Sequence, residues 1–206
     1  MTQAQFFEQV DVSRETQERL LTYATLLQKW NPAINLVAPS TIRDMWIRHF
    51  MDSAQVAEIA PGHHRNWCDL GSGGGFPGVV TAILALETDP DRTTTCIESD
   101  QRKSAFLRTV GRETGAKLTV ISERIEAAPK QNAEIVSARA LASLDDLLSL
   151  AFRHLAKDGE CLFLKGRNYK DEIDSALENW SFQYDTYASK TNSDAAILRI
   201  GELSRA

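Results

Sequence analysis

The chain has 206 residues, a formal net charge of −5 and three cysteines. This length suits one α/β domain with a small extension and excludes two full-sized domains. The acidic balance argues against indiscriminate binding of nucleic acid, so any RNA contact must come from a local basic patch. The longest apolar run, residues 79–86, is far shorter than the ~20 residues that cross a bilayer. We therefore expect a soluble, unprocessed, cytoplasmic protein without a membrane partner.

The cysteines Cys68, Cys96 and Cys161 all fall in predicted core strands and lack the spacing of metal ligands. We expect them to be small buried hydrophobic residues in a reducing compartment. No metal site is predicted.

Two helices are predicted in the N-terminal third of the chain. Ser13 can cap the first helix, and Asn31-Pro32 is expected to end it. The second helix is predicted to start near Ser40 or Thr41 and to stop before Pro61-Gly62. Its apolar stripe consists of Met45, Trp46, His49, Phe50 and Val56. These patterns predict a helical extension over residues 1–62.

From about residue 66 the chain alternates short apolar strands with helical segments. Strands are predicted at residues 67–70, 93–98, 117–121, 134–138 and 161–165. Helices are predicted at residues 78–87, 102–114, 143–156 and 169–180. Two further runs, residues 182–187 and 195–200, are expected to form an antiparallel pair at the edge of the sheet. The alternation predicts a Rossmann-like α/β domain over residues 63–206, with helices on both faces of a mostly parallel sheet.

A glycine turn between the first strand and its helix is the strongest functional signal. Residues 67–78 read Trp-Cys-Asp-Leu-Gly-Ser-Gly-Gly-Gly-Phe-Pro-Gly. Glycines let the backbone approach a ligand closely, and free amides at a helix start offer hydrogen bonds, so the turn indicates a nucleotide cofactor. Gly73-x-Gly75-x-x-Gly78, with Glu98 at about the expected ~20-residue spacing, also satisfies the dinucleotide fingerprint. A nicotinamide oxidoreductase is therefore an alternative.

The charge of the turn favours a different cofactor. Asp69 places a carboxylate where a pyrophosphate would want positive potential, and Pro77 removes an amide donor. S-adenosylmethionine presents an ammonium and a sulfonium, which Asp69 would attract. Glu98, at the end of the second strand, is expected to accept hydrogen bonds from the ribose hydroxyls of either cofactor. After the third strand, Ile125 is expected to pack on the adenine ring.

Several motifs together resemble the small-subunit ribosomal RNA methyltransferase G family. They are the Asp-Leu-Gly-Ser-Gly-Gly-Gly-Phe-Pro-Gly turn, Trp30-Asn31-x-x-x-Asn35-Leu36, Arg48-His49-Phe50-Met51-Asp52-Ser53 and Ser137-Ala138-Arg139-Ala140. The resemblance covers nearly the whole chain. It implies methyl transfer from S-adenosylmethionine to N7 of one guanine in bacterial 16S ribosomal RNA, by a Rossmann-like domain with an N-terminal helical extension.

The resemblance also implies cofactor contacts at Gly71, Phe76, Ile125, Glu126 and Arg139. With Asp69, Gly73 and Glu98 from the turn and the second strand, they complete the predicted cofactor site. The resemblance gives no role to the last forty residues.

Arg139 is the predicted catalytic residue. Guanine N7 carries a lone pair and no proton, so the reaction needs alignment of the reactants and no general base. Arg139 ends the fourth predicted strand, where the sheet faces its ligand crevice. Its guanidinium can hold the cofactor carboxylate, which the resemblance favours, or reach guanine O6. The alternative is a strand-end arginine that pairs with a nearby acid.

RNA contacts are predicted at Lys165 and Arg167 after the fifth strand, and at Arg48 and His49 in the extension, because phosphates need local positive charge. A solvated rim is the alternative for the first pair. His49 is also compatible with a buried, hydrogen-bonded histidine. The expected partner is 16S RNA or the small ribosomal subunit, with a monomer as the default. The remaining rivals are a methyltransferase acting on another substrate and a non-catalytic nucleoside-binding or RNA-binding module.

Overall fold

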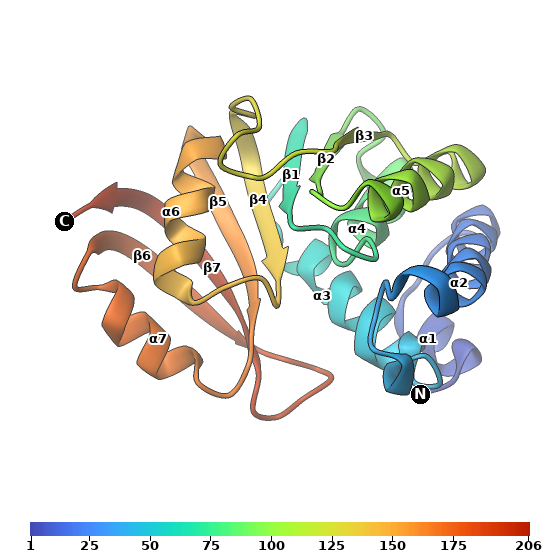
Figure 1. Cartoon of the computed structure of the whole chain (residues 1–206). Helices are drawn as coiled ribbons and strands as arrows, with labels where there is room; N and C mark the ends of the chain where they lie inside the picture. Colours follow the sequence, from blue (N-terminus) through green and yellow to red (C-terminus); the bar gives the residue numbers. More distant parts are fainter.

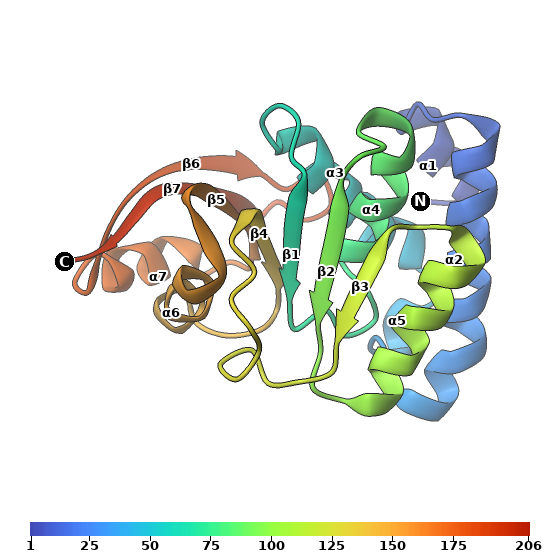
Figure 2. The same cartoon turned by 90° about the horizontal axis from the view of Figure 1, so that it is seen from above.

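The computed structural model describes all 206 residues and contains one seven-stranded sheet (Figures 1 and 2). The strands lie in the order β3-β2-β1-β4-β5-β7-β6. Their bounds are β1 Asn66–Leu70, β2 Thr93–Ile97, β3 Leu118–Ile121, β4 Ala133–Arg139, β5 Leu155–Lys165, β6 Trp180–Ala188 and β7 Ala196–Arg205. The first five strands pair in parallel, and β7 pairs antiparallel with both β5 and β6. The predicted α/β sheet with an antiparallel edge pair is confirmed.

Helices cover both faces of this sheet. The helices are α1 Gln3–Gln9, α2 Arg14–Ile34, α3 Asp52–Ile59, α4 Gly78–Thr88, α5 Gln101–Thr114, α6 Leu144–His154 and α7 Tyr169–Ala176. Helices α3, α4 and α5 lie on one face, and α6 and α7 lie on the other (Figure 2). Helices α1 and α2 form a further layer outside α4 and α5 (Figures 1 and 2). The N-terminus lies in this layer, far from the C-terminus at the end of β7.

The N-terminal helices share a hydrophobic core with the sheet domain. Tyr23 and Leu27 of α2 are fully buried in one cluster with Ile83 of α4 and Phe106 of α5. A second cluster lies between the sheet and α6 with α7. We therefore propose that residues 1–62 are an extension folded onto the domain of residues 63–206. No helix combines the length and the apolar character needed to cross a membrane.

The first long helix does not end at Pro32 as predicted. It continues to Ile34 and ends at Asn35, which adopts the left-handed conformation with φ 49°. Pro32 lies in the last turn, where it forfeits only its own N–H donor, and the Asn35 N–H still bonds to the Asn31 carbonyl. The Asn31 side chain instead accepts a hydrogen bond from the Val37 N–H at 2.9 Å. Ser13 caps the helix start as predicted.

The second predicted helix is divided. A 3-10 turn at Pro39–Thr41 and a π-helical turn at Trp46–Met51 precede α3. The predicted apolar stripe is nevertheless buried at all five positions. The wider π turn changes the direction of Arg48 and His49 relative to an ordinary helix, and such turns are frequent at functional sites. The sequence pattern also missed α1, which Thr2 and Gln5 cap reciprocally.

Other boundaries differ in the C-terminal half. Strand β5 begins at Leu155, six residues before the predicted start at Cys161. The apolar pattern did not indicate this start, because Lys157 and Asp158 are polar and exposed. Helix α7 ends at Ala176 instead of Trp180, which already begins β6. The three cysteines are fully buried and free, as predicted.

The shared core predicts that the extension and the sheet unfold together. Leu27→Ala should lower the free energy of unfolding by about 2–5 kcal/mol, because it opens a cavity between α2 and the sheet domain. Leu26→Ala, at a partly buried neighbour, is the matched control and should cost clearly less. Urea denaturation followed by circular dichroism and by tryptophan fluorescence should give coincident single transitions. Two separate transitions would contradict the shared core.

Candidate active site

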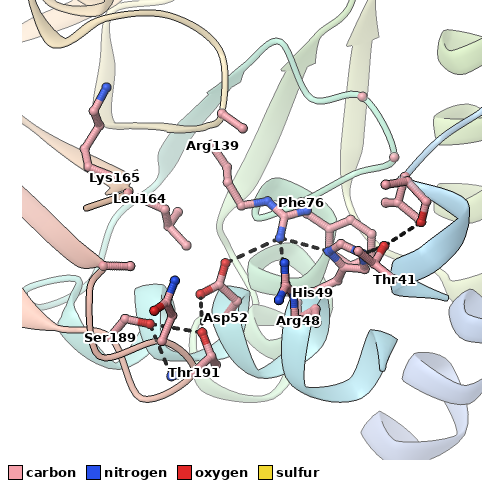
Figure 3. A pocket seen from close by; sticks show the side chains of 18 of the residues that line it. Thr41, Arg48, His49, Asp52, Phe76, Arg139, Leu164, Lys165, Ser189 and Thr191 are labelled. Carbon is pink, nitrogen blue, oxygen red and sulfur yellow. Dashed lines mark hydrogen bonds and ion pairs between the residues drawn. The ribbon is translucent and has the colours of Figure 1, made fainter. Parts of the chain in front are cut away.

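A cavity of about 540 Å³ opens at the carboxyl ends of β1, β4 and β5 (Figure 3). The neighbours β1 and β4 are where the order of the strands reverses, which is where open α/β sheets bind ligands. The glycine turn forms one wall, and Arg139 projects into the cavity from the end of β4. The extension and the loop between β6 and β7 complete the lining.

The glycine turn needs glycine for two different reasons. Gly75 has φ 96°, and a Cβ there would lie 2.7 Å from the Tyr23 hydroxyl. Gly73 has φ 55°, but a Cβ there would meet only the Gly71 carbonyl oxygen at 3.8 Å. Gly75 therefore permits close packing inside the protein, whereas Gly73 leaves open space beside the backbone.

The extension holds this turn directly. The buried Tyr23 hydroxyl of α2 donates a hydrogen bond to the Gly74 carbonyl at 2.5 Å. The Tyr23 ring stacks on Phe76, with 5.2 Å between the ring centroids. Phe76 in turn lies beneath the Arg139 guanidinium, and Arg139 Cζ is 5.0 Å from the centroid of the Phe76 ring. Helix α2 thus positions the turn and the aromatic surface that supports Arg139.

Arg139 is anchored by a single nitrogen. Its Nη1 contacts the Arg48 carbonyl at 3.0 Å, His49 Nδ1 at 3.0 Å and Asp52 Oδ2 at 3.4 Å (Figure 3). Nε and Nη2 make no hydrogen bond within the protein. The predicted alternative, a pair with an acid, is present through Asp52. Nevertheless, the remaining edge of the guanidinium is available to a ligand.

His49 is buried and neutral. Its Nε2 lies 2.7 Å from the Thr41 hydroxyl, which donates its own proton to the Ala38 carbonyl. Nε2 must therefore carry the imidazole proton, which leaves Nδ1 to accept from Arg139. Burial, together with the charges of Arg139 and Arg48, lowers the pKa of His49 to about 3. The predicted alternative of a buried, hydrogen-bonded histidine is confirmed.

Asp69 lies beneath the turn and does not line the cavity. Its side chain is fully buried, and Oδ1 accepts a hydrogen bond from the Ser137 hydroxyl at 2.6 Å. Oδ2 has no hydrogen-bond partner and faces the start of α4, where a Cβ on Gly78 would approach it to 2.7 Å. Burial raises the pKa of Asp69 to about 6.

Glu98 joins the second strand to the glycine turn. Its Oε2 accepts from the Gly73 N–H and its Oε1 from the Asp100 N–H, both at 2.8 Å. Each carboxylate oxygen has a second lone pair, so Glu98 can still accept hydrogen bonds from a ligand. Glu98 therefore lies beside the turn, as predicted, although it does not line the cavity.

Ile125 and Glu126 are not brought to the cavity. The Ile125 side chain packs in the core with α6, and its carbonyl lies 2.9 Å from His154 Nε2. Glu126 is exposed. Their contact with an adenine ring stays a prediction.

The predicted RNA contacts differ in availability. Lys165 is buried, donates to the Ala142 carbonyl at 2.9 Å and pairs with Glu172 at 2.5 Å. Lys165 lines the cavity, but its ammonium points away from Asp52 and Arg139 in Figure 3, so a phosphate contact at Lys165 stays a prediction. Arg48 and Arg167 are exposed, and neither side chain forms an ion pair. Arg48 also lines the cavity.

The sequence patterns missed the part of the lining that comes from the β6–β7 loop. Ser189, Thr191 and Asn192 line the cavity from this loop. One signal was present. A strand antiparallel to β5 must begin at the edge where β5 ends, and Ala196 of β7 indeed pairs with Lys165 of β5.

The raised pKa of Asp69 predicts a dependence of stability on pH. Because the folded state holds this proton up to about pH 6 and the unfolded state only to 3.8, stability should fall by about 3 kcal/mol as pH rises between these values. Asp69→Asn removes the titrating group. The urea denaturation midpoint of this variant should therefore fall less steeply with rising pH between 3.8 and about 6 than that of the wild type. Equal slopes in both proteins would contradict the raised pKa.

Comparisons with known proteins agree on one family. The sequence matches the family described as rRNA small subunit methyltransferase G over residues 16–197. The protein of that name from Ruegeria sp. (strain TM1040) is 51% identical over 197 residues, covering 96% of both chains. That from Rhodospirillum centenum is 51% identical over 193 residues, covering 94% of this chain and 87% of the other.

Solved structures share the fold. A SAM-dependent methyltransferase from Aquifex aeolicus aligns with TM-score 0.57 and 10% identity, covering 86% of this chain and 97% of the other. M. jannaschii TYW2 in complex with AdoMet aligns with TM-score 0.55 and 13% identity, covering 82% and 78%. The predicted Rossmann-like methyltransferase fold is confirmed, and the oxidoreductase alternative is not favoured. The chain belongs to the rRNA small subunit methyltransferase G family.

Proposed function

We propose that this protein transfers a methyl group from S-adenosylmethionine to N7 of one guanine in 16S ribosomal RNA, either free or in the small ribosomal subunit. Family membership supports the small-subunit RNA as acceptor. The observation that carries the reaction is the unpaired edge of Arg139, which faces the cavity beside a glycine turn. We further infer a cytoplasmic monomer that acts without a metal.

The titratable groups of the cavity support an acceptor atom without a proton. Both nitrogens of His49 are engaged, and its pKa is lowered to about 3 by burial and by neighbouring arginines. Asp52 accepts hydrogen bonds from Thr191 and Arg139. Neither group is free to act as a general base, which an amine or hydroxyl acceptor would need. Guanine N7 needs none.

The residues around the turn fit S-adenosylmethionine. The turn leaves open space at Gly73, and the carboxylates Asp69 and Glu98 give it a negative environment. Such an environment suits a ligand with an ammonium and a sulfonium and opposes a pyrophosphate. Asp69, whose Oδ2 has no partner, would act from beneath the turn.

We assign the cofactor to contacts along this edge of the sheet. Gly71, Gly73, Phe76, Glu98 and Arg139 would hold it. Ile125 and Glu126, which follow β3, are proposed to border its adenine through their backbone. When bound, S-adenosylmethionine supplies an electrophilic methyl group.

The work of the protein is alignment of the reactants. Arg139 Nη1 is fixed by the extension, so Nε and Nη2 are held ready to bind a carboxylate of the cofactor. Guanine O6 is the alternative ligand for this edge of the Arg139 guanidinium. The apolar cavity walls contributed by Leu36, Phe76 and Leu164 would help to keep water from the reacting atoms once both substrates are bound.

Arg48 and Arg167 are the cations proposed to contact RNA phosphates. Both are exposed, and Arg48 lies at the cavity itself. With a net charge of −5, the protein must rely on such local contacts. Because a duplex buries its base edges in a narrow groove, the target guanine should lie in a loop or be turned out of its stack.

The direct test is transfer of isotopically labelled methyl from S-adenosylmethionine to ribosomal RNA from cells that lack this gene. Naked 16S RNA and isolated small subunits should be compared, and 7-methylguanine should then be mapped by chemical cleavage. Label at one guanine of 16S RNA is the expected result. Label elsewhere, or no label with measurable cofactor binding, would overturn the proposed acceptor.

Arg139→Ala should lower methyl transfer by about tenfold or more, because the fixed donor edge is lost. Arg139→Lys keeps the charge without the planar fork and should recover only part of the activity. Circular dichroism should show that both variants are folded. Near-normal transfer by the alanine variant would remove Arg139 from the mechanism.

A further inference from the structure

The loop between β6 and β7 forms a wall of the cavity that holds Arg139 (Figure 3). Ser189, Thr191 and Asn192 contribute to the lining. The loop reaches this place because β7 runs antiparallel to β5, so the start of β7 lies at the carboxyl end of β5. A segment near the C-terminus therefore meets the N-terminal extension across the cavity.

Contacts attach the loop to α3. The Thr191 hydroxyl donates a hydrogen bond to Asp52 Oδ1 at 2.9 Å. The Lys190 N–H donates to Gln55 Oε1 at 2.9 Å, and the Lys190 ammonium pairs with Glu58. The Lys190 and Glu58 side chains are about half exposed, so their pair is screened by solvent, whereas the Asp52 side chain is only 18% exposed. The bond from Thr191 is thus the better shielded of the two side-chain attachments.

Asp52 connects Thr191 to Arg139. One carboxylate oxygen accepts from Thr191, and the other faces Arg139 Nη1 at 3.4 Å. Gln55 Nε2 also approaches Oδ1, at 3.2 Å. Because a carboxylate is planar, fixing Oδ1 also fixes the direction of Oδ2. Without Thr191, Oδ1 keeps only the longer contact from Gln55, so the Asp52 carboxylate is held less firmly toward the guanidinium.

We propose that Thr191 is a positioning residue for methyl transfer, which orients the Asp52 carboxylate so that Asp52 holds Arg139 at the cavity. This inference rests on the function proposed above for Arg139. It assigns the β6–β7 loop to the active site, as the element that completes the support of the guanidinium from the side opposite His49.

The charges around Asp52 determine how the proposal is tested. Arg139 faces it from β4, Arg48 and His49 from the π turn, and Lys190 lies on the facing loop beyond Gln55. Burial raises the pKa of Asp52, and the charge of Arg139 and the bond from Thr191 oppose that rise. Loss of the hydroxyl should therefore raise the pKa of Asp52 further. A loop that only stabilises the fold would not shift the pH profile of kcat together with this titration.

The experiment compares Thr191→Val, which removes only the hydroxyl, with Thr191→Ser, which keeps it. Thr186→Val, at an exposed position of β6 in the same hairpin, is the matched control. The Asp52 carboxyl is titrated by ¹³C NMR, and kcat and KM for RNA are measured across pH. Thr191→Val should lower kcat about three- to tenfold, shift the acid limb of the kcat profile to higher pH, and raise the Asp52 titration midpoint.

Thr191→Ser should restore all three quantities, and Thr186→Val should leave them unchanged. A wild-type titration midpoint and pH profile in Thr191→Val would overturn the positioning role. A change in KM alone would also overturn it, because it would indicate a direct RNA contact. If the wild-type protein transfers no methyl to ribosomal RNA, the proposed function fails, and the inference fails with it. The NMR titration distinguishes failure of the proposed function from absence of the Thr191–Asp52 contact, because it reports that contact without any substrate.

Discussion

The three contacts of Arg139 Nη1 are the constraint on which the candidate site depends. A long arginine side chain would otherwise sample many rotamers, at a cost of about 2 kcal/mol when it is ordered for binding. Here one nitrogen is held by acceptors from the extension while Phe76 supports the plane of the group. The lowered pKa of His49 belongs to the same arrangement, because a protonated imidazole would repel the guanidinium instead of accepting its hydrogen bond.

The same constraint explains why the extension is packed so closely against the sheet. Tyr23 holds the glycine turn from α2, while the π turn supplies the acceptors for Arg139. Under the turn, Trp67 Nε1 donates to the Ser137 hydroxyl, which donates to Asp69. Buried polar groups of this kind are stable only when their partners are fixed. The extension and the buried network therefore hold the two sides of one turn.

Much of the fold could be predicted from the sequence because its signals are local. Alternating strands and helices, the glycine turn and the edge pair follow from periodicity and from residues next to each other. The prediction failed where distant packing decides the outcome. Pro32 is tolerated because it lies in a last turn that Asn35 can close, and the helix before α3 opens into a π turn that carries His49. No local pattern indicates either feature.

The candidate site, like the fold, could be predicted where its signals are local and could not where it depends on packing. The turn and Arg139 were located by motif and by their position at strand ends. The pairing of Lys165 with Glu172 depends on the packing of α7, and the burial of Ile125 depends on α6. Asp69 was expected at the ligand because its charge suits a cation, but the strand turns its side chain beneath the backbone. The contribution of Thr191 required the antiparallel register of β7.

Glu98 has one further consequence for binding. Its carboxylate already holds the Gly73 N–H in this structure, and Tyr23 holds the adjacent carbonyl of Gly74. Groups of the protein itself thus hold the turn from both sides, so association of a ligand should lose little backbone conformational entropy there. These two hydrogen bonds therefore preorganise the turn, which favours binding by lowering its entropic cost.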